Sequence, residues 1–282
     1  MFKRKNFHFR LILFTIGLLL VSNMVLKLKK PTLDTSNKML IHFIDVEQGD
    51  SILVQVNNKN LLIDSGPSSA KENLFNYLNS INVKTFNYII ATHPHEDHIG
   101  NMSSIINNFE VLNFYAPKVT NNTKAFETMV ESLTRKNLKI NVIKANINSI
   151  DLGENTKVEF FSPNNSTYDN INNYSPIFKI TYEKTSFLFT GDAEELIESE
   201  VINNNYNLKA DLLKIGHHGS STSTSKRFFE SVNPKISVIS VGKNNTYNHP
   251  TEEVLSTINN SKILRTDLNG NILITSDGLS LK

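Results

Sequence analysis

A loop segment reads Thr92-His93-Pro94-His95-Glu96-Asp97-His98 and places four potential metal ligands within six residues. It follows the apolar stretch 86–91, which we expect to form a buried strand that runs directly into His93. A regular helix would spread these side chains over several faces, whereas a loop after a strand lets them converge. Neutral imidazoles and a carboxylate suit zinc, and also manganese or iron. The segment therefore predicts a metal site.

Polar residues recur after two further apolar stretches that we expect to be strands. Asp192 follows the first, and beside a metal site its two carboxylate oxygens can bridge two ions. His217 and His218 follow the second, between glycines, where they can reach a metal and a substrate oxygen. His249 lies in a later loop near Tyr247. Because α/β sheets place their chemistry at strand ends, these residues are candidates for the same site.

Apolar stretches of strand length alternate along the chain with stretches of helical spacing, which indicates an α/β sandwich rather than an all-β domain. We expect strands at 39–46, 51–56, 61–64, 86–91, 111–115, 177–182, 186–190, 212–215 and 236–241. We expect helices at 71–80, 99–107, 123–136, 194–201 and 225–231. About 250 residues remain after the N-terminal segment, enough for one large domain with a buried core. His42 is more simply a packed histidine of the first strand than a ligand.

The N-terminus has the pattern of a membrane segment. Residues 1–10 are basic, residues 11–26 are almost wholly apolar, and Lys27, Lys29 and Lys30 close the run. Its length lies between a signal-peptide core and a short spanning helix. We favour an uncleaved anchor in residues 1–30, with a cleaved signal and a buried helix as alternatives. Residues 31–38 would then be a linker, and residues 39–282 a hydrolase domain on the outer side of the cell membrane, or secreted after cleavage.

The composition excludes several classes of protein. There is no cysteine, so the chain has no disulfide framework, thiolate metal site, cysteine nucleophile or cysteine-linked partner. Seven of the 29 basic residues lie in residues 1–30, which contain no acid, so 22 basic residues face 27 acidic ones in the remainder. The composition therefore shows no basic footprint for non-specific binding of nucleic acid.

The His-x-His-x-Asp-His run resembles the signature of the metallo-β-lactamase superfamily. More narrowly, the chain is similar over residues 39–280 to the extracellular domain of the competence protein family known as ComEC/Rec2. The similar stretches are 43–51 (Phe-Ile-Asp-Val-Glu-Gln-Gly-Asp-Ser), 62–66 (Leu-Ile-Asp-Ser-Gly), 188–193 (Leu-Phe-Thr-Gly-Asp-Ala), 217–220 (His-His-Gly-Ser) and 247–250 (Tyr-Asn-His-Pro). This resemblance implies a four-layer αββα sandwich, here preceded by one hydrophobic helix. We expect a stand-alone relative without the family's channel domain, so DNA import is not carried over.

The resemblance also implies two divalent metal ions, with zinc preferred and manganese as the alternative. His93 and His95 would hold the first ion. Asp97 and His98 would hold the second, and Asp192 would bridge the two.

One member of the histidine pair would complete the second site, with His218 slightly preferred to His217. The remaining histidine would polarise a phosphoryl oxygen or protonate the leaving group, and Asp97 would act first as a ligand and second as a proton acceptor. Asp64 and Asp45 would support the ligand loops structurally.

The chain departs from the family in two places. Many members have a further first-site histidine between the signature and the bridging aspartate, but residues 99–191 contain none. Asn173 or Ser175 is expected to take that place and to contact substrate. Tyr247 and His249 are also expected to contact substrate, with a loop packed by Pro250 as the alternative. Glu47 stands where the family usually has glycine, which alters a turn and not a ligand.

These residues predict a binuclear hydrolase that activates water for in-line attack on phosphorus. We favour a phosphodiesterase or nuclease acting on DNA or another phosphodiester. The alternatives are a phosphoesterase on cell-surface polymers of the teichoic-acid type, a β-lactam or lactone hydrolase, and a surface domain whose metal site is vestigial. The membrane would be a second partner, through the N-terminal segment.

Overall fold

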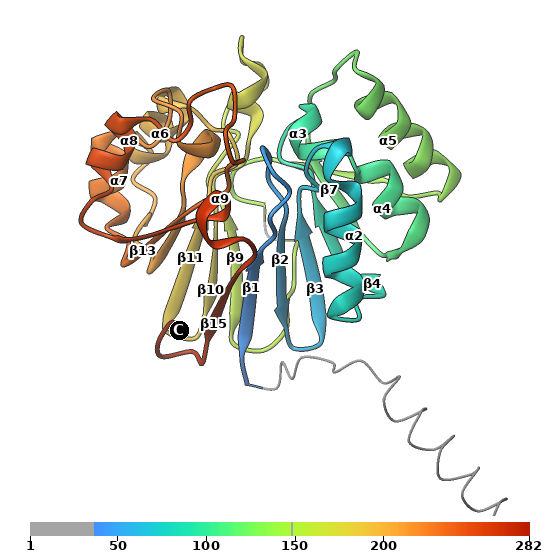
Figure 1. Ribbon diagram of the computed structural model, residues 1–282, viewed down its shortest axis with the longest axis horizontal. Helices are drawn as coiled ribbons and strands as arrows, with labels where there is room; N and C mark the ends of the chain where they lie inside the picture. The colour runs from blue at the N-terminus through green and yellow to red at the C-terminus, as the bar shows by residue number, and fades with distance from the viewer. Residues whose placement is uncertain (1–36, 148) are drawn as a thin grey trace, which may run out of the picture.

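The computed structural model describes residues 37–147 and 149–282. In its first half, strands alternate with helices, as the apolar periodicity predicts (Figure 1). The elements, with η for a short 3₁₀ helix, are β1 (Met39–Phe43), β2 (Ile52–Val56), β3 (Lys59–Ile63), η1 (Ser68–Ala70), α2 (Lys71–Ser80), β4 (Thr85–Phe86), β5 (Tyr88–Ile90), α3 (Glu96–Ile99), α4 (Met102–Asn108), β6 (Glu110–Val111), β7 (Phe114–Pro117), α5 (Lys124–Arg135) and β8 (Ile140–Ile143).

The second half continues this alternation and returns to the first sheet with its last strand. Its elements are β9 (Thr156–Phe160), η2 (Ile171–Tyr174), β10 (Phe178–Tyr182), β11 (Thr185–Phe189), α6 (Glu195–Asn203), β12 (Leu212–Lys214), η3 (Gly216–Gly219), α7 (Lys226–Val232), β13 (Ile236–Ile239), α8 (Glu252–Thr257), β14 (Lys262–Arg265), α9 (Thr266–Asn269) and β15 (Ile272–Ser276).

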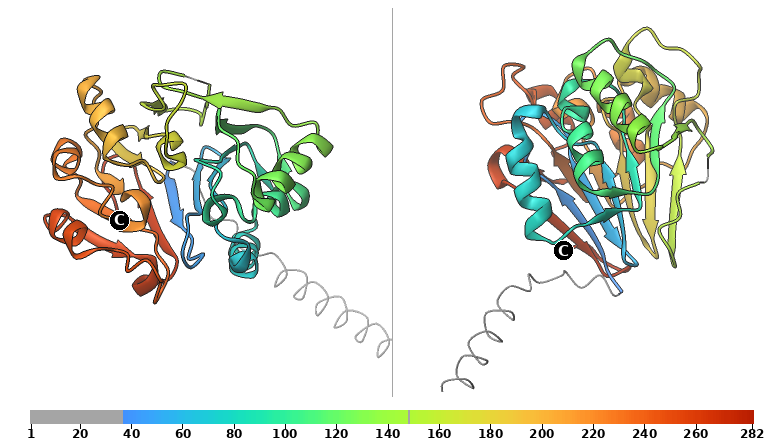
Figure 2. Two further views of the ribbon diagram at one scale, coloured as in Figure 1. Left: turned by 90° about the horizontal axis from the view of Figure 1, so that it is seen from above. Right: turned by 90° about the vertical axis from the view of Figure 1, so that its right-hand side faces the viewer.

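Two sheets lie face to face, and helices cover their outer sides. One sheet has the strand order β15-β1-β2-β3-β5-β7-β8 and the other β14-β13-β12-β11-β10-β9. Seen from above, the helices of the two halves lie on opposite sides of this pair (Figure 2). The arrangement is a four-layer αββα sandwich and confirms the expected fold class.

The alternation of apolar side chains along each strand explains the layers. Met39, Ile41 and Phe43 of β1 point into the core between the two sheets. Leu53 and Leu62 point the opposite way, into a second core beneath the helices α2, α4 and α5. A third core fills the space under α6, α7 and α8. Strands that are apolar on both faces therefore require a layer on each side.

The topology brings the polar segments to one edge. β3 pairs in parallel with β5, and β11 with β12, so their carboxyl ends point the same way within each sheet. Asp64 directly follows β3, and His93 follows β5 by three residues. In the other sheet, Asp192 follows β11 by three residues, and His217 follows β12 by three residues. The candidate site therefore lies at the upper edge of the sandwich in Figure 1, beside α3.

Some boundaries differ from the sequence-based expectation. The helix expected at 99–107 is divided into α3 and α4, and α3 begins at Glu96, so Asp97 and His98 lie in a short helix rather than in a loop. The strand expected at 86–91 is interrupted at Asn87. β8, β9, α8, β14, α9 and β15 were not expected. β8, for example, is an edge strand with three exposed residues, so its sequence lacks the alternation of a half-buried strand.

The N-terminal prediction lies outside the described residues, because residues 1–36 are not among them. Within the described part of the chain, no helix combines the length and apolar character needed to cross a bilayer. The anchor or signal in residues 1–30 and most of the linker therefore stay predictions.

The aromatic stack on β9, β10 and β11, at one end of the second sheet, provides a test of the core between the sheets. Phe178 lies opposite Phe160 and Phe189 on the neighbouring strands, with ring centroids 5.1 and 5.2 Å away. We expect Phe178→Ala to lower the free energy of unfolding by about 3–5 kcal/mol, because it leaves a cavity. Leu279→Ala, at a side chain that is 68% exposed, should change it by less than about 0.5 kcal/mol. Urea unfolding measures both, and equal effects would contradict this packing.

Candidate metal centre

Asp64 organises the loop that follows β5. This carboxylate is fully buried, and it accepts hydrogen bonds from the backbone N–H of Thr92 (2.8 Å) and from its hydroxyl (2.7 Å). It also lies 2.8 Å from Nδ1 of His98. Burial raises the pKa of Asp64, although the contact with His98 opposes that rise. Asp64 thus fixes the ring of His98 and leaves its Nε2 pointing away, which is the role expected of a support beneath a ligand.

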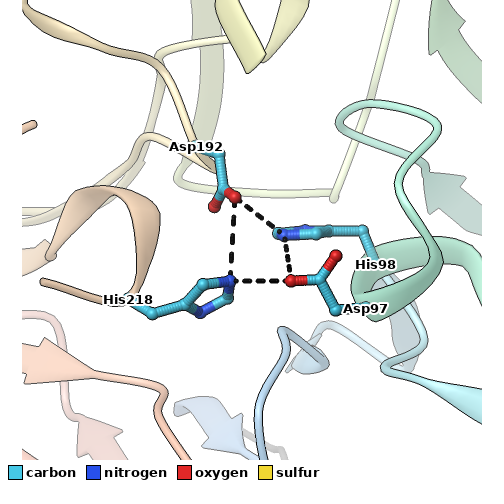
Figure 3. Close-up of side chains that lie close together, drawn as sticks. All are labelled: Asp97, His98, Asp192 and His218. Atoms are coloured by element: carbon cyan, nitrogen blue, oxygen red, sulfur yellow. Dashed lines mark ion pairs between the residues drawn. The ribbon is translucent and has the colours of Figure 1, made fainter. Parts of the chain in front are cut away.

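Four side chains from three segments of the chain, namely α3, the turn after β11 and η3, converge at one point (Figure 3). Nε2 of His98 lies 3.2 Å from Oδ2 of Asp192 and 3.8 Å from Oδ2 of Asp97. Nε2 of His218 lies 3.3 Å from the same oxygen of Asp97 and 3.7 Å from that of Asp192. This set matches the residues expected to hold the second ion.

A second pair of nitrogens lies next to this group. Nε2 of His93 and Nδ1 of His95 are 3.0 Å apart, and Nε2 of His93 is 3.7 Å from Oδ2 of Asp192. Oδ2 of Asp192 is therefore within 3.7 Å of His93 as well as of His98 and His218. This proximity to both predicted ligand sets is compatible with a bridging carboxylate.

The two histidines of η3 have different environments. His218 is buried, and its Nδ1 lies 2.9 Å from the carbonyl oxygen of Ser240. A carbonyl oxygen only accepts, so Nδ1 carries the proton and Nε2 faces Asp97 and Asp192. His217 is partly exposed, with Nε2 3.6 Å from Asp192. The geometry favours His218 as the ligand and leaves His217 at the mouth of the site.

The local backbone explains how both histidines reach the site. His217 and His218 have φ of 47° and 54°, in the left-handed region that non-glycine residues rarely adopt. Two consecutive left-handed residues make a sharp turn directly after β12. Such strained backbone is found at functional sites, where surrounding contacts hold it.

Ser175 and Asn173 lie close to the centre, but their contacts are with protein groups. The buried Ser175 hydroxyl is 3.2 Å from Nδ1 of His93 and accepts a hydrogen bond from the backbone N–H of Asp192. Nδ1 is the nitrogen opposite the one that faces Asp192, so Ser175 orients a ligand. Asn173 is buried and pairs with the side chain and backbone N–H of Glu194. A substrate-binding role for Ser175 and Asn173 stays a prediction.

Asp45, Tyr247 and His249, which were also predicted as site residues, lie outside the ligand cluster. Asp45 accepts a hydrogen bond from the backbone N–H of Glu47 and supports that turn, outside the ligand cluster. Glu47 has a φ of 63°, which explains why glycine suits this position. The His249 ring lies 5.8 Å from that of His217, and Tyr247 stacks on His249 at 5.7 Å. These two rings continue the site outward from His217.

The cluster fits divalent ions. Among the described residues, Oδ1 of Asp192 and Nε2 of both His98 and His218 are buried without a hydrogen-bond partner. Each such atom costs about 1–3 kcal/mol unless something satisfies it. Zinc bonds of about 2.0–2.2 Å place tetrahedral ligand atoms roughly 3.3–3.6 Å apart, close to the spacings observed here. The donor set of imidazoles and carboxylates, without sulfur, suits zinc or manganese.

A buried ion pair that was not predicted from the sequence lies behind the cluster. Nζ of Lys214 lies 2.9 Å from Oδ2 of Asp50, and both side chains are fully buried. Oδ1 of Asp50 is 3.5 Å from Nδ1 of His218, and the Asp50 backbone N–H donates to the carbonyl of Asp97. A side chain at Gly49 would collide with that same carbonyl, at 2.3 Å. Asp50 therefore connects the loops that carry Asp97 and His218.

Carboxylates govern the protonation of the second site. Burial alone would lower the pKa of His98, but Asp192, Asp97 and Asp64 raise it well above its ordinary value. Burial also opposes protonation of His218, yet Asp192, Asp50 and Asp97 raise its pKa to about 10. Without metal, these carboxylates favour the protonated form of both rings.

The first site behaves differently. Burial, followed by the charge of His98, lowers the pKa of His93 well below its ordinary value, and burial lowers the pKa of His95. These two imidazoles are neutral at neutral pH and ready to bind a metal. Only the second site must lose protons when it is filled.

We expect zinc binding to release about two protons, one each from His98 and His218, because a ligand imidazole must be neutral. Below the raised pKa values, affinity for the second ion should fall by about 100-fold for each unit that the pH falls. Calorimetry of chelator-treated protein in buffers of different ionisation enthalpy measures the protons released. His93→Ala, which alters only the first site, should release the same two. Binding without proton release would contradict the assignment.

We expect Asp50→Asn or Lys214→Met to lower the free energy of unfolding by about 3–5 kcal/mol, because each leaves a buried charge unpaired. The double variant should lose much less than the sum. Urea unfolding in the presence of chelator removes any contribution from metal binding. Glu159→Gln, which breaks an exposed pair with Lys157, should change stability by less than about 1 kcal/mol. Additive losses at Asp50 and Lys214 would show that they do not form a pair.

Known proteins share this sequence pattern and fold. ComE operon protein 3 of Bacillus subtilis is 31% identical over 254 residues, which cover 82% of this chain and 32% of that protein. Recombination protein 2 of Haemophilus influenzae is 27% identical over 269 residues, which cover 92% of this chain and 31% of that protein. The chain thus spans about a third of the length of these relatives. The resemblance inferred from the sequence is confirmed.

A solved structure agrees on the fold. The metallo-beta-lactamase fold protein YhfI from Bacillus subtilis superposes with a TM-score of 0.58 at 12% identity, covering 86% of this chain and 100% of that chain. Residues 44–243 match the family model of the metallo-beta-lactamase superfamily. With the ligand groups described above, this match supports a metal-dependent hydrolase that uses divalent metal ions. Its fold, its ligand cluster and this match over most of its length agree: the chain belongs to the metallo-β-lactamase superfamily.

Proposed function

We propose that this protein is a binuclear zinc phosphodiesterase that cleaves DNA or another phosphodiester, with manganese as the alternative metal. The observation that carries the proposal is that Oδ2 of Asp192 lies 3.7 Å from Nε2 of His93 and 3.2 Å from Nε2 of His98, within reach of both predicted ligand sets. Two ions sharing a carboxylate form the arrangement that suits in-line displacement at phosphorus.

When bound, the ions would neutralise the phosphate charge and make water a better nucleophile. The chain's own groups would position and transfer protons. His217 is partly exposed beside Asp192, and its Nδ1 lies 3.2 Å from the hydroxyl of Thr222, which orients the ring. Its Nε2 would donate a proton to the leaving oxygen. Asp97 is partly exposed at the same mouth and would serve as ligand first and as proton acceptor second.

The relatives support a role near nucleic acid. Recombination protein 2 is named for recombination. It is about three times as long as the segment that matches this chain, so its activity is carried over only as a proposal. We further propose that residues 1–30 hold the domain at the outer face of the cell membrane. The apolar run 11–26 between basic residues motivates this placement.

A phosphoesterase acting on cell-surface polymers is the second candidate. The chain after residue 30 carries more acidic than basic residues, 27 against 22. An acidic domain repels a dense polyanion such as DNA, whereas a substrate with widely spaced phosphates needs no basic groove.

We expect Asp192→Asn to lose bound metal and at least about 100-fold in activity, because it removes the shared anionic ligand. Metal content is measured by mass spectrometry after chelation and addition of zinc or manganese. Cleavage of single-stranded DNA is followed in parallel, with His95→Ala as a second ligand variant. Asp151→Asn, an exposed aspartate paired with Lys59, is the matched control and should behave as wild type. Wild-type metal content and turnover in Asp192→Asn would overturn the proposal.

The substrate is decided by the same assay. Metal-restored cleavage that is absent from His95→Ala establishes a nuclease. Stoichiometric metal without DNA cleavage, together with hydrolysis of a polyol-phosphate polymer, favours the second candidate. The salt dependence of substrate binding distinguishes the two, because many phosphate contacts give a steep slope.

A further inference from the structure

A line of three rings leads outward from the metal centre. His217, whose Nε2 is 3.6 Å from Asp192, meets the ring of His249 edge-on at 5.8 Å. His249 in turn lies nearly parallel to Tyr247, with ring centroids 5.7 Å apart and an interplanar angle of 25°. The Tyr247 side chain is 65% exposed. A large aromatic ring held against another ring yet open to solvent offers a flat surface for a ligand.

Tyr247 also lines a cavity of about 510 Å³ between the turn after β1 and the loop after β13. The two loops are joined because the side-chain oxygen of Gln48 accepts a hydrogen bond from the backbone N–H of Gly242. Asn245 fixes the second loop through hydrogen bonds with Gly242, Tyr247 and His249. Hydrogen bonds therefore fix the backbone that forms the cavity, and the cavity has room for a single ring system of a ligand.

The charge of the lining disfavours a phosphate group. Asp45, Glu47 and Asp267 contribute three carboxylates, against Lys243 and the Arg265 that pairs with Asp267. A phosphate would meet net repulsion there, whereas the metal centre, which the rings of His249 and His217 connect to Tyr247, would attract anions. The cavity thus suits the uncharged part of a substrate whose phosphate lies at the metals.

Unused polar groups in the lining are suited to a neutral heterocycle. Within the described residues, the side chains of Glu47, Asn244 and Thr246 make no hydrogen bond. A carboxylate accepts from ring or amino N–H groups, and an amide both donates and accepts. A planar ligand stacked on Tyr247 would therefore find hydrogen-bond partners at its edge.

We propose that this cavity, with Tyr247 as its stacking surface, binds the nucleobase next to the phosphodiester that is cleaved. The inference rests on the proposed phosphodiesterase and names its substrate class as nucleotides. Stacking of a base on an aromatic side chain contributes about 1–3 kcal/mol. The base would thus select nucleic acid over other phosphodiesters even though the domain is acidic.

Three substrates with one leaving group test the proposal on the full chain loaded with zinc. They are thymidine 5′-(p-nitrophenyl phosphate), the corresponding abasic deoxyribose ester, and methyl p-nitrophenyl phosphate. We expect kcat/KM for the thymidine ester to exceed that for either of the others by about 5- to 150-fold. The comparison is a ratio within one protein, so a general loss of activity in a variant cancels.

Two variants locate the effect. Tyr247→Ala should reduce the thymidine-to-abasic ratio to near one, whereas Tyr247→Phe, which keeps the ring, should preserve it. An unchanged ratio in Tyr247→Ala overturns the inference. So does an abasic ester that reacts as fast as the thymidine ester, because a sugar would then occupy the cavity. If none of the esters is hydrolysed although metal is bound, the proposed function fails instead.

Discussion

Three carboxylates are buried at one end of the sandwich, and much of the surrounding structure neutralises them. Asp50, Asp64 and Asp192 are all shielded from solvent. An unpaired charge in such a place would unfold the protein or become protonated. Asp50 is paired with Lys214, and Asp64 with Thr92 and His98. Asp192 is surrounded by imidazoles, with His93, His98, His217 and His218 all within 3.7 Å of its Oδ2.

The partners of the three carboxylates also contact one another's carboxylates, so the site is one connected unit. His98 contacts both Asp64 and Asp192, and His218 contacts both Asp50 and Asp192. The first sheet supplies the signature loop and the second supplies Asp192 and the paired histidines. The layers must therefore pack correctly before the ligands can meet, and the apolar core between the sheets is a condition for the chemistry.

The sequence was sufficient to predict the fold class and the ligand cluster, because both leave local signals. Apolar alternation marks strands such as β1, and four ligands within six residues mark the signature loop. The signal failed where a role depends on distant partners. Asp50 and Lys214 are far apart in sequence, and no local sequence pattern indicates that they form an ion pair. The contact of the Ser175 hydroxyl with Nδ1 of His93 is likewise a relation that only the packed sheets define.

The segments that carry the predicted metal ligands and the loop that carries Tyr247 differ in burial, and this difference suits them to different roles. The ligand loops are buried, and their backbone is held by Asp64, Asp50 and Ser175, so they can keep a fixed geometry for the ions. The loop that carries Tyr247 is exposed and bears no ligand of the cluster, so it can differ without disturbing the metals. In the proposed nucleotide substrate, the phosphate would lie at the metal centre and the neutral base in the acidic cavity. Substrate choice would then depend on the ring and not on the density of phosphate charge.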